Sequence, residues 1–380
     1  DRLLAHVAER LRALAYDNAV FGRLGGDEFA VVIPDFSHPD RVEAFGRRIV
    51  DTLSQPYDVD RHRLVIGASI GIALAPRDGR SADALVRAAD LALYQSKSSG
   101  GGRVHRYENQ FEAEAEDRRL MQIALQTALE RQEFELIYRP VFDAEGRQMT
   151  HMDAQICWHS AELGDVPPEK FLPIARECDL ISPLGQWALR TACQDVAGWP
   201  EPMGVLLALA PEQITDAGFV PFIMQALGQS RIAATRLTLE VTERVLQRTG
   251  LAGLATLDNL HRLGVRLSLG EFGTGTSALG HLSKSPFSIV RIHPKLIGAA
   301  AGEDRESAAR LRAIITLADN LGILPIVEGI ESEKEQQLAR NLGCRFMQGG
   351  HVAERIRARE VPYYLANPNR MPPETRAHLG

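Results

Sequence analysis

Hydrophobic and polar positions follow two periods along this chain. Apolar residues recur every three or four positions in segments that we expect to be helices, and in short or alternating runs in segments that we expect to be strands. In the first part of the chain the predicted helices span residues 3–15, 41–54 and 82–97, and the predicted strands span 29–33 and 64–73. Because paired glycines supply the positive φ angles of a tight turn, Gly25 and Gly26 predict a hairpin around residues 24–27.

A tract of serine and glycine at residues 98–102 interrupts this pattern, and a charged helix is predicted over 107–132. Its apolar residues predict one packed stripe, formed by Phe111, Leu120, Ile123 and Ala128. We interpret residues 1–107 as a first domain and residues 108–132 as a helix that connects it to a second.

The rest of the chain alternates short strand patterns with helical ones. Strands are predicted at 135–142, 204–210, 236–241, 266–269, 289–292 and 324–327, and helices at 183–197, 251–263 and 307–321. Several strands end in polar residues, at Glu240, Gly270-Glu271, His293 and Glu328, as in the active-site mouth of a (β/α)₈ barrel. We predict this α/β barrel over residues 133–365, with a tail at 366–380. An open doubly wound sheet is the competing fold, but no Gly-rich phosphate turn follows its first strand.

Composition narrows the function. The 380 residues are 45% hydrophobic and 24% charged, as expected for two globular domains. A net charge of -6 argues against binding a nucleic acid polymer, although a small nucleotide remains possible. The four cysteines, Cys157, Cys178, Cys193 and Cys344, have no CxxC spacing, so we expect neither a zinc site nor disulfides. With no long apolar stretch and no leader, we predict a cytoplasmic chain without a membrane segment, and the start at Asp1 suggests a piece of a longer protein.

The first domain carries three sequence blocks in a recognisable order. They are Gly25-Gly26-Asp27-Glu28-Phe29 preceded by Arg23-Leu24, then residues 68–73 (ASIGIA), then residues 89–97 (ADLALYQSK). The first block alone indicates only a hairpin. Together the blocks resemble the GGDEF family of diguanylate cyclases over residues 1–107, which implies a cyclase-like α/β sandwich and GTP as a possible ligand.

Parts of that family pattern are missing from this chain. A second metal-binding aspartate and a nucleotide-contacting segment would precede Asp1, and phosphoryl transfer needs metal to offset the charge on the phosphate oxygens. The arginine and aspartate of the family's feedback site align with Tyr16 and Ala19. We therefore expect no cyclase activity here, although Asp27 and Glu28 would serve in a longer protein that supplies the missing segment.

The second domain carries a longer series of short blocks. They are Tyr138-Arg139-Pro140, Phe171-Leu172-Pro173, Leu184-Gly185-Gln186-Trp187, residues 239–243 (LEVTE), Phe272-Gly273-Thr274-Gly275, residues 328–331 (EGIE) and Gln348-Gly349. In this order they resemble EAL domains, the barrel phosphodiesterases that linearise cyclic di-GMP, over residues 133–354. The resemblance implies a two-metal hydrolytic site at the mouth of the barrel.

Several positions depart from the EAL pattern. The naming motif aligns with Asp153-Ala154-Gln155, the phosphate-contacting arginine with Cys157 and a metal-binding asparagine with Ala208. The paired aspartates align with Gly270 and Glu271, the water-orienting lysine with Arg291, and a further aspartate with His293. Glu240, Glu328 and Gln348 match the pattern, and the two glutamates are remnants of the metal site.

These departures argue against hydrolysis. Two divalent ions need a full set of oxygen ligands, and too few remain, so we expect no cofactor and no phosphodiesterase activity. Mg²⁺ or Mn²⁺ would be needed only if the chain is an enzyme after all. Candidate ligand-binding residues are Arg139, Asp153, Gln155, Glu240, Glu271, Arg291, Glu328 and Gln348. Cyclic di-GMP would bind mainly through Arg139 and Arg291, against repulsion by an acidic mouth.

Two further hypotheses stay open. Glu240, Glu271, His293 and Glu328 would suit a transition metal, but a tolerated replacement at His293 is simpler. Because the family loop at 272–279 couples the site to dimerisation, we favour a homodimeric, catalytically inactive GGDEF-EAL regulator, with protein partners unidentified. The rival is an active enzyme, either a phosphodiesterase with a rearranged metal site or a cyclase in the full-length protein.

Overall fold

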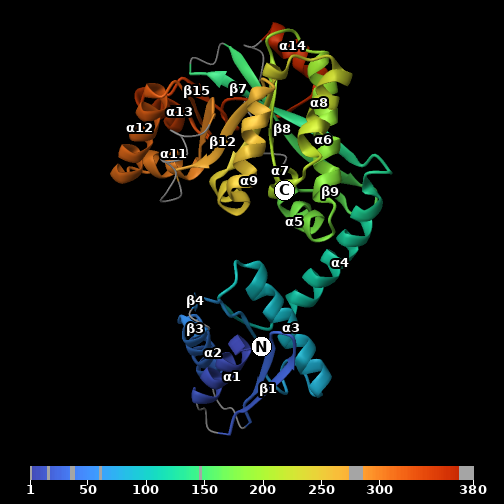
Figure 1. Ribbon diagram of the computed structural model, residues 1–380, viewed down its shortest axis with the longest axis vertical. Coiled ribbons are helices and arrows are strands. Elements are labelled where there is room, and N and C mark those ends of the chain that lie inside the picture. Colours follow the sequence, from blue (N-terminus) through green and yellow to red (C-terminus); the bar gives the residue numbers. More distant parts are fainter. Residues whose placement is uncertain are drawn as a thin grey trace. The chain divides into compact units, whose positions relative to one another are not determined.

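The computed structural model describes residues 2–14, 18–34, 39–59, 62–144, 148–273 and 286–367. The chain divides into two compact units, Asp1–Leu120 and Met121–Gly380 (Figure 1). Tyr16 and most of the 272–279 loop lie outside the described residues, as does most of the tail.

Helices and short sheets alternate in the first unit. Its helices are α1 (Arg2–Ala13), α2 (Pro39–Leu53) and α3 (Ala82–Ser98). In the described residues the strands pair as β1 (Val20–Gly25) with β2 (Glu28–Val32), β3 (Tyr57–Val59) with β4 (His62–Leu64), and β5 (Ile70–Ile72) with β6 (Val104–Arg106). The apolar faces of α1 and α2 pack together through Val7, Leu11, Phe45 and Ile49. The three predicted helices and the predicted hairpin are confirmed.

The prediction of a single strand over residues 64–73 is wrong. The chain forms β4 up to Leu64 and β5 from Ile70, and these strands belong to different sheets. β4 pairs antiparallel with β3, whereas β5 pairs parallel with β6. The apolar run is continuous in sequence, but the backbone changes pairing partner within it, and periodicity does not report such a change.

The connecting helix is shorter than predicted and is buried differently. It is α4 (Gln110–Ala128), and Phe111 and Ala128 are buried as expected. Leu120 and Ile123 are instead 42% and 52% exposed, so the predicted single stripe is wrong. Phe111 packs with Tyr107 and α3 residues, whereas the other end of α4 packs in a cluster of the second unit. The helix therefore contributes to two cores and leaves its middle exposed.

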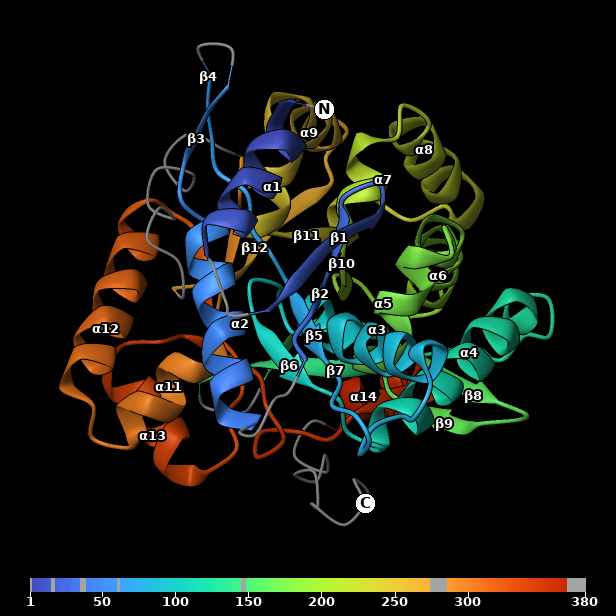
Figure 2. The same ribbon diagram turned by 90° about the horizontal axis from the view of Figure 1, so that it is seen from below.

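The strands of the second unit form a closed barrel. Figure 2 shows helices of this unit around its strands. Among the described residues its strands are β7 (Phe134–Asp143), β8 (Met149–Ser160), β10 (Gly204–Ala208), β11 (Leu237–Thr242), β12 (Arg266–Phe272), β13 (Ile289–Ile292), β14 (Leu324–Val327) and β15 (Phe346–Met347). Strands β8 and β10 to β15 run parallel, β7 runs antiparallel to β8 and β15, and the β7–β8 pair closes the ring. Short strands β9 (Gly164–Val166) and β16 (Ile356–Arg357) extend it. Closure excludes the doubly wound sheet.

Helices cover the outside of this barrel. They are α5 (Pro168–Glu177), α6 (Ile181–Ala197), α7 (Pro211–Thr215), α8 (Phe219–Ser230), α9 (Glu243–Arg262), α11 (Pro294–Ala301), α12 (Arg305–Asn320), α13 (Glu333–Asn341) and α14 (Val361–Ala366). The six predicted strands and three predicted helices of this region are all present, with shifted ends at most of them. Leucine, isoleucine and valine from strands and helices form the main core, and smaller apolar clusters lie beside it.

Candidate functional site

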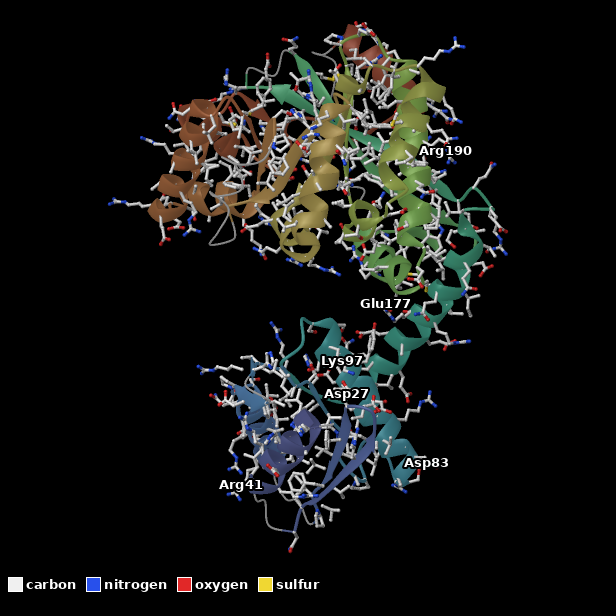
Figure 3. The ribbon with its side chains drawn as sticks, in the orientation of Figure 1. Asp27, Arg41, Asp83, Lys97, Glu177 and Arg190 are labelled. Carbon is white, nitrogen blue, oxygen red and sulfur yellow. The ribbon has the colours of Figure 1, made fainter. Side chains whose placement is uncertain are left out.

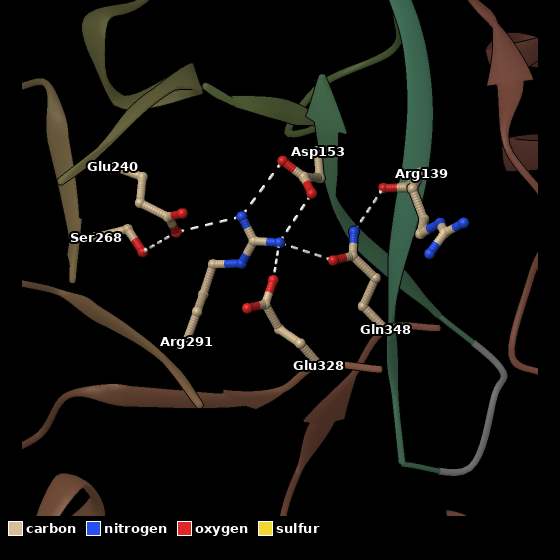
Figure 4. Close-up of polar contacts among 7 residues, drawn as sticks. All are labelled: Arg139, Asp153, Glu240, Ser268, Arg291, Glu328 and Gln348. Atoms are coloured by element: carbon tan, nitrogen blue, oxygen red, sulfur yellow. Dashed lines mark hydrogen bonds and ion pairs between the residues drawn. The ribbon is translucent and has the colours of Figure 1, made fainter. Parts of the chain in front are cut away.

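Arg291 is the centre of the polar groups inside the barrel (Figure 4). It lies on β13, a strand whose four residues are all buried, and its own residue is 5% exposed. Its Nη2 donates to Asp153 Oδ2 at 2.8 Å, and its Nη1 donates to Asp153 Oδ1 at 3.3 Å. This two-pronged pairing is the strong form of an arginine–carboxylate contact.

Two further carboxylates bind the same guanidinium. Nη1 donates to Glu240 Oε2 at 3.2 Å, and Nη2 forms an ion pair with Glu328 Oε1. Neutral groups complete the arrangement: Ser268 Oγ donates to Glu240 Oε2 at 3.1 Å, and Gln348 Oε1 accepts from Nη2 at 2.8 Å. We call these six residues, Asp153, Glu240, Ser268, Arg291, Glu328 and Gln348, the Arg291 cluster.

Strand register explains why the cluster forms. Glu240 on β11 is paired with Ser268 on β12, and Arg291 lies on the next strand. Glu328 directly follows β14, and Gln348 directly follows β15. Neighbouring parallel strands lie about 4.8 Å apart, so side chains near their carboxyl ends meet inside the barrel.

The cluster holds one cation and three carboxylates away from water. Burial raises the pKa of Glu328 to about 8, and Glu240 and Asp153 add to the rise while Arg291 opposes it. The pKa of Glu240 is raised too, first by burial. Burial would lower the pKa of Arg291, but the three carboxylates outweigh it and hold that pKa well above its usual value. Arg291 therefore stays charged, and the excess of carboxylates favours proton uptake by the glutamates.

Gly270 leaves room that Glu240 fills. A Cβ built on Gly270 would lie 2.5 Å from both the Cδ and the Oε1 of Glu240. The carboxylate of Glu240 is held there by Ser268 and Arg291. A side chain at this position, where the family resemblance implied an aspartate, would meet the Glu240 carboxylate unless that carboxylate moved.

The residues present do not fit a pair of divalent cations. The guanidinium of Arg291 already binds the three carboxylates that would have to turn toward metal, and Ala208, paired in register with Glu240, offers no donor atom. Among the described residues, no group of three or more His, Cys, Asp and Glu side chains is placed to hold a metal ion.

Other predicted site residues have different surroundings. Glu271 is exposed at the end of β12 with a φ of 53°, and Gln155 is exposed on β8. His293 caps α11, since its Nδ1 accepts from the backbone N of Lys295 at 3.1 Å. In the part of the chain that the structure describes, no group of three or more such side chains is placed to form the mixed transition-metal site. The backbone oxygen of Arg139 accepts from Gln348 Nε2 at 3.1 Å, while its guanidinium points away from Arg291 (Figure 4).

Two expectations about the mouth of the barrel stay predictions, the first of them for Arg291. It was expected to meet a ligand phosphate, but its two terminal nitrogens are already occupied by carboxylates and by Gln348. The glutamates were expected to make the mouth acidic, but Glu240 and Glu328 share the charge of Arg291 and have raised pKa values. In the structure the side chains of the cluster neutralise one another, which single positions in the sequence do not show.

The hairpin of the first unit contrasts with this buried cluster. Gly26 adopts a φ of 51° at the turn, and the Nε of Arg23 donates to its backbone oxygen at 3.0 Å. Asp27 and Glu28 are exposed, and Asp27 is labelled at the turn in Figure 3. Phe29 is partly buried against the first-unit core.

Sequence reasoning overlooked Ser268 and strand β8. Ser268 is fully buried within the apolar strand β12, and a polar residue in such a run is a usable signal. Strand β8 alternates His151, Asp153 and Gln155 with Met152 and Ala154, a period of two that would have predicted it.

In the described part of the chain, no helix combines the length and apolar character needed to cross a bilayer.

Comparison with known proteins agrees with this architecture. The model for the EAL domain matches residues 122–355, and the model for the diguanylate cyclase GGDEF domain matches residues 1–103. MucR of Pseudomonas aeruginosa, a bifunctional diguanylate cyclase/cyclic di-GMP phosphodiesterase, is 35% identical over 353 residues, which are 92% of this chain and 51% of MucR. An uncharacterized protein, y4lL of Sinorhizobium fredii, is 33% identical over 349 residues, covering 92% of this chain and 42% of y4lL.

A solved structure also matches. The PaMucR phosphodiesterase in its c-di-GMP complex has a TM-score of 0.61 and 31% identity, and the match covers 64% of this chain and 99% of that one. The chain spans about half of the length of the curated relatives named above. The chain therefore belongs to the EAL domain family, and ahead of that domain it carries part of a diguanylate cyclase GGDEF domain.

Proposed function

We propose that this chain acts in cyclic di-GMP signalling as a catalytically inactive regulator, which binds nucleotide or partner protein rather than hydrolysing the nucleotide. The signalling context follows from the GGDEF and EAL domains and from relatives such as MucR. The loss of hydrolysis is supported by one observation: Arg291 occupies the carboxylates on which a two-metal site would depend. A cytoplasmic location and a homodimeric state belong to the same proposal.

Electrostatics and geometry both disfavour hydrolysis at this site. Two divalent ions would bring four positive charges to carboxylates that now share one guanidinium. They would also have to displace Arg291, which cannot lose its charge and is buried beyond easy escape to water. Gly270 and Ala208 supply no replacement oxygen.

An activity assay tests this proposal directly. The full chain is incubated with cyclic di-GMP and either Mg²⁺ or Mn²⁺, and linear pGpG is measured by chromatography, with the EAL domain of MucR as the positive control. We expect no product above the level without protein. Multiple turnovers that EDTA abolishes would instead establish the alternative, a phosphodiesterase with a rearranged metal site.

The cyclase alternative concerns the other unit. Asp27 and Glu28 remain exposed at the hairpin turn, and MucR is described as bifunctional. Incubation of this chain with GTP and Mg²⁺ should give no cyclic di-GMP. Synthesis that is lost in the Asp27→Ala variant would contradict the proposal for this unit.

A further inference from the structure

A groove of about 530 Å³ runs along helix α3 in the first unit. One wall is the face of α3 that carries Asp83, Val86, Arg87, Asp90, Leu91 and Tyr94, and the other is the first half of α4. Asp83 lies near the start of α3 and Lys97 near its end (Figure 3). Both walls belong to the first unit.

Contacts within the first unit hold the two walls of the groove together. Phe111 of α4 packs in one cluster with Ala88 and Ala92, which are buried on α3. Farther along the helices, the Cζ of Arg118 lies over the ring of Tyr94, 5.0 Å from its centroid. The groove is therefore a built feature of this unit.

The groove face of α3 carries apolar and charged residues that its own unit leaves exposed. Val86 is 49% exposed and Tyr94 is 38% exposed. Asp83, Arg87 and Asp90 are exposed beside them, and within the described ranges no ion pair or side-chain hydrogen bond involves these three. Positions 83, 87, 90 and 94 have the three- and four-residue spacing of one helix face. An exposed apolar patch bordered by charges is typical of an interaction surface.

The order of the charges makes this face complementary to itself. A two-fold axis between Arg87 and Asp90 sets α3 of a second copy antiparallel to the first, so that Arg87 faces Asp90 of the other copy. Symmetry makes the same contact twice. Val86 and Leu91 lie equally far from this axis, so they face each other as an apolar pair. A parallel arrangement would instead set Arg87 against Arg87 and Asp90 against Asp90, which repel.

A second antiparallel register also matches opposite charges but buries less apolar surface. With the axis between Asp83 and Arg87, these two residues face each other. Leu91 would then lie opposite position 79, which precedes the start of α3 at Ala82. The register centred between residues 87 and 90 is therefore favoured, because it matches charge and apolar surface together.

We propose that the groove of the first unit is a docking surface for the same groove of a second copy, with the two α3 helices antiparallel about an axis between Arg87 and Asp90. The inference rests on the proposed function, because it names an interface for the homodimeric regulator. One pair of 17-residue helices is a small contact beside the about 1,200–2,000 Å² of a stable interface, so we expect a dimer that depends on protein concentration. In this role the first unit needs neither GTP nor a metal ion.

Sedimentation velocity of the full chain over a range of protein concentrations tests the interface. We expect the wild type to dimerise and Arg87→Glu or Asp90→Arg alone to weaken dimerisation at least about 10-fold, because each sets like charges together at two symmetric contacts. The double variant Arg87→Glu/Asp90→Arg exchanges the charges and should regain the wild-type dissociation constant to within about 3-fold. Arg41→Glu makes the same charge change on the exposed start of α2 (Figure 3) and should leave dimerisation unchanged. Thermal midpoints of all variants confirm that each is folded.

The possible results separate this inference from the proposed function. A wild-type dimer that Arg87→Glu leaves intact would overturn the α3 interface but keep a homodimer formed by another surface. Weakening that the double variant fails to reverse would overturn the pairing of Arg87 with Asp90. A wild type that stays monomeric at high micromolar concentration would overturn both the interface and the homodimeric part of the proposed function, and the assay for pGpG would still test catalytic inactivity by itself.

Discussion

The hairpin of the first unit keeps the residue types of its family motif, whereas the Arg291 cluster of the second unit has different residue types that form a buried polar site. The hairpin keeps all five signature residues, Gly25 to Phe29, and its two acidic side chains are exposed. The cluster occupies a region where most family positions have changed, yet its side chains are buried and linked to one another. A motif can therefore keep its residue types without forming a buried polar site, and a buried polar site can persist after its residue types have changed.

The difference has a physical origin. An exposed carboxylate is stabilised by water whatever its neighbours are, so Asp27 and Glu28 need no partners to persist. A buried carboxylate needs a cation or a proton, because its transfer from water is costly. Without a pair of metal ions, buried carboxylates in the barrel would lack a positive partner. Arg291 supplies the positive charge from within the chain.

The largest expected effect comes from removing that charge. Arg291→Met keeps a long apolar stem but leaves three carboxylates without their cation, so we expect a loss of about 3–5 kcal/mol in the free energy of unfolding. Urea denaturation monitored by circular dichroism gives the value. Arg310→Met is the matched control, because Arg310 pairs with Glu306 on the exposed side of α12 and should cost about 0.5 kcal/mol. Equal losses in both variants would refute a structural role for the cluster.

A smaller effect is expected from pH. The pKa of Glu328 is raised to about 8 in the folded chain, so between about 4.5 and 8 the folded state binds more protons than the unfolded state. Stability should then fall as pH rises through this window, by on the order of 2–4 kcal/mol. Glu328→Gln should flatten the dependence of the thermal midpoint on pH, whereas Glu333→Gln, on the exposed start of α13, should not. An unchanged slope in Glu328→Gln would show that the proton is held elsewhere.

Sequence patterns predicted the barrel well and the cluster only in part. Runs such as residues 289–292 and 324–327 gave strand bounds that the structure reproduces, because buried parallel strands are apolar on both faces. The same patterns failed at Leu120 and Ile123, where one helix serves two cores. Periodicity measures the apolar face of an element and does not identify its packing partners.

The composition of the cluster was within reach of sequence, but its pairing was not. Asp153, Glu240, Arg291, Glu328 and Gln348 were all candidate ligand-binding residues. Their mutual contacts depend on side-chain directions that are set by barrel register, which a single sequence does not reveal. The side chain of Glu240 fills the space beside Gly270, although 30 residues separate the two in sequence. This contact too depends on the tertiary structure.

Gly270 allows a sharper test of this closure. In Gly270→Ala the new Cβ would lie 2.5 Å from the Glu240 carboxylate, whose shift would weaken its contacts with Ser268 and Arg291. We expect a loss of about 1–2 kcal/mol. Gly228→Ala is the control: this helical glycine in α8 has open space around its Cβ position, so the same change should stabilise by about 0.5–1 kcal/mol. A stabilising Gly270→Ala would mean that Glu240 is free to move.

The smallest effects are expected at the hairpin, and they complete the comparison. Asp27→Ala and Glu28→Ala remove exposed carboxylates, so each should change the free energy of unfolding by no more than about 0.5 kcal/mol. Gly26→Ala should cost about 1 kcal/mol, because only its φ of 51° penalises a side chain and no atom lies near the new Cβ. A loss above about 2 kcal/mol in Asp27→Ala would reveal that this carboxylate has buried partners, and the contrast between a merely retained motif and an interlocked site would then fail.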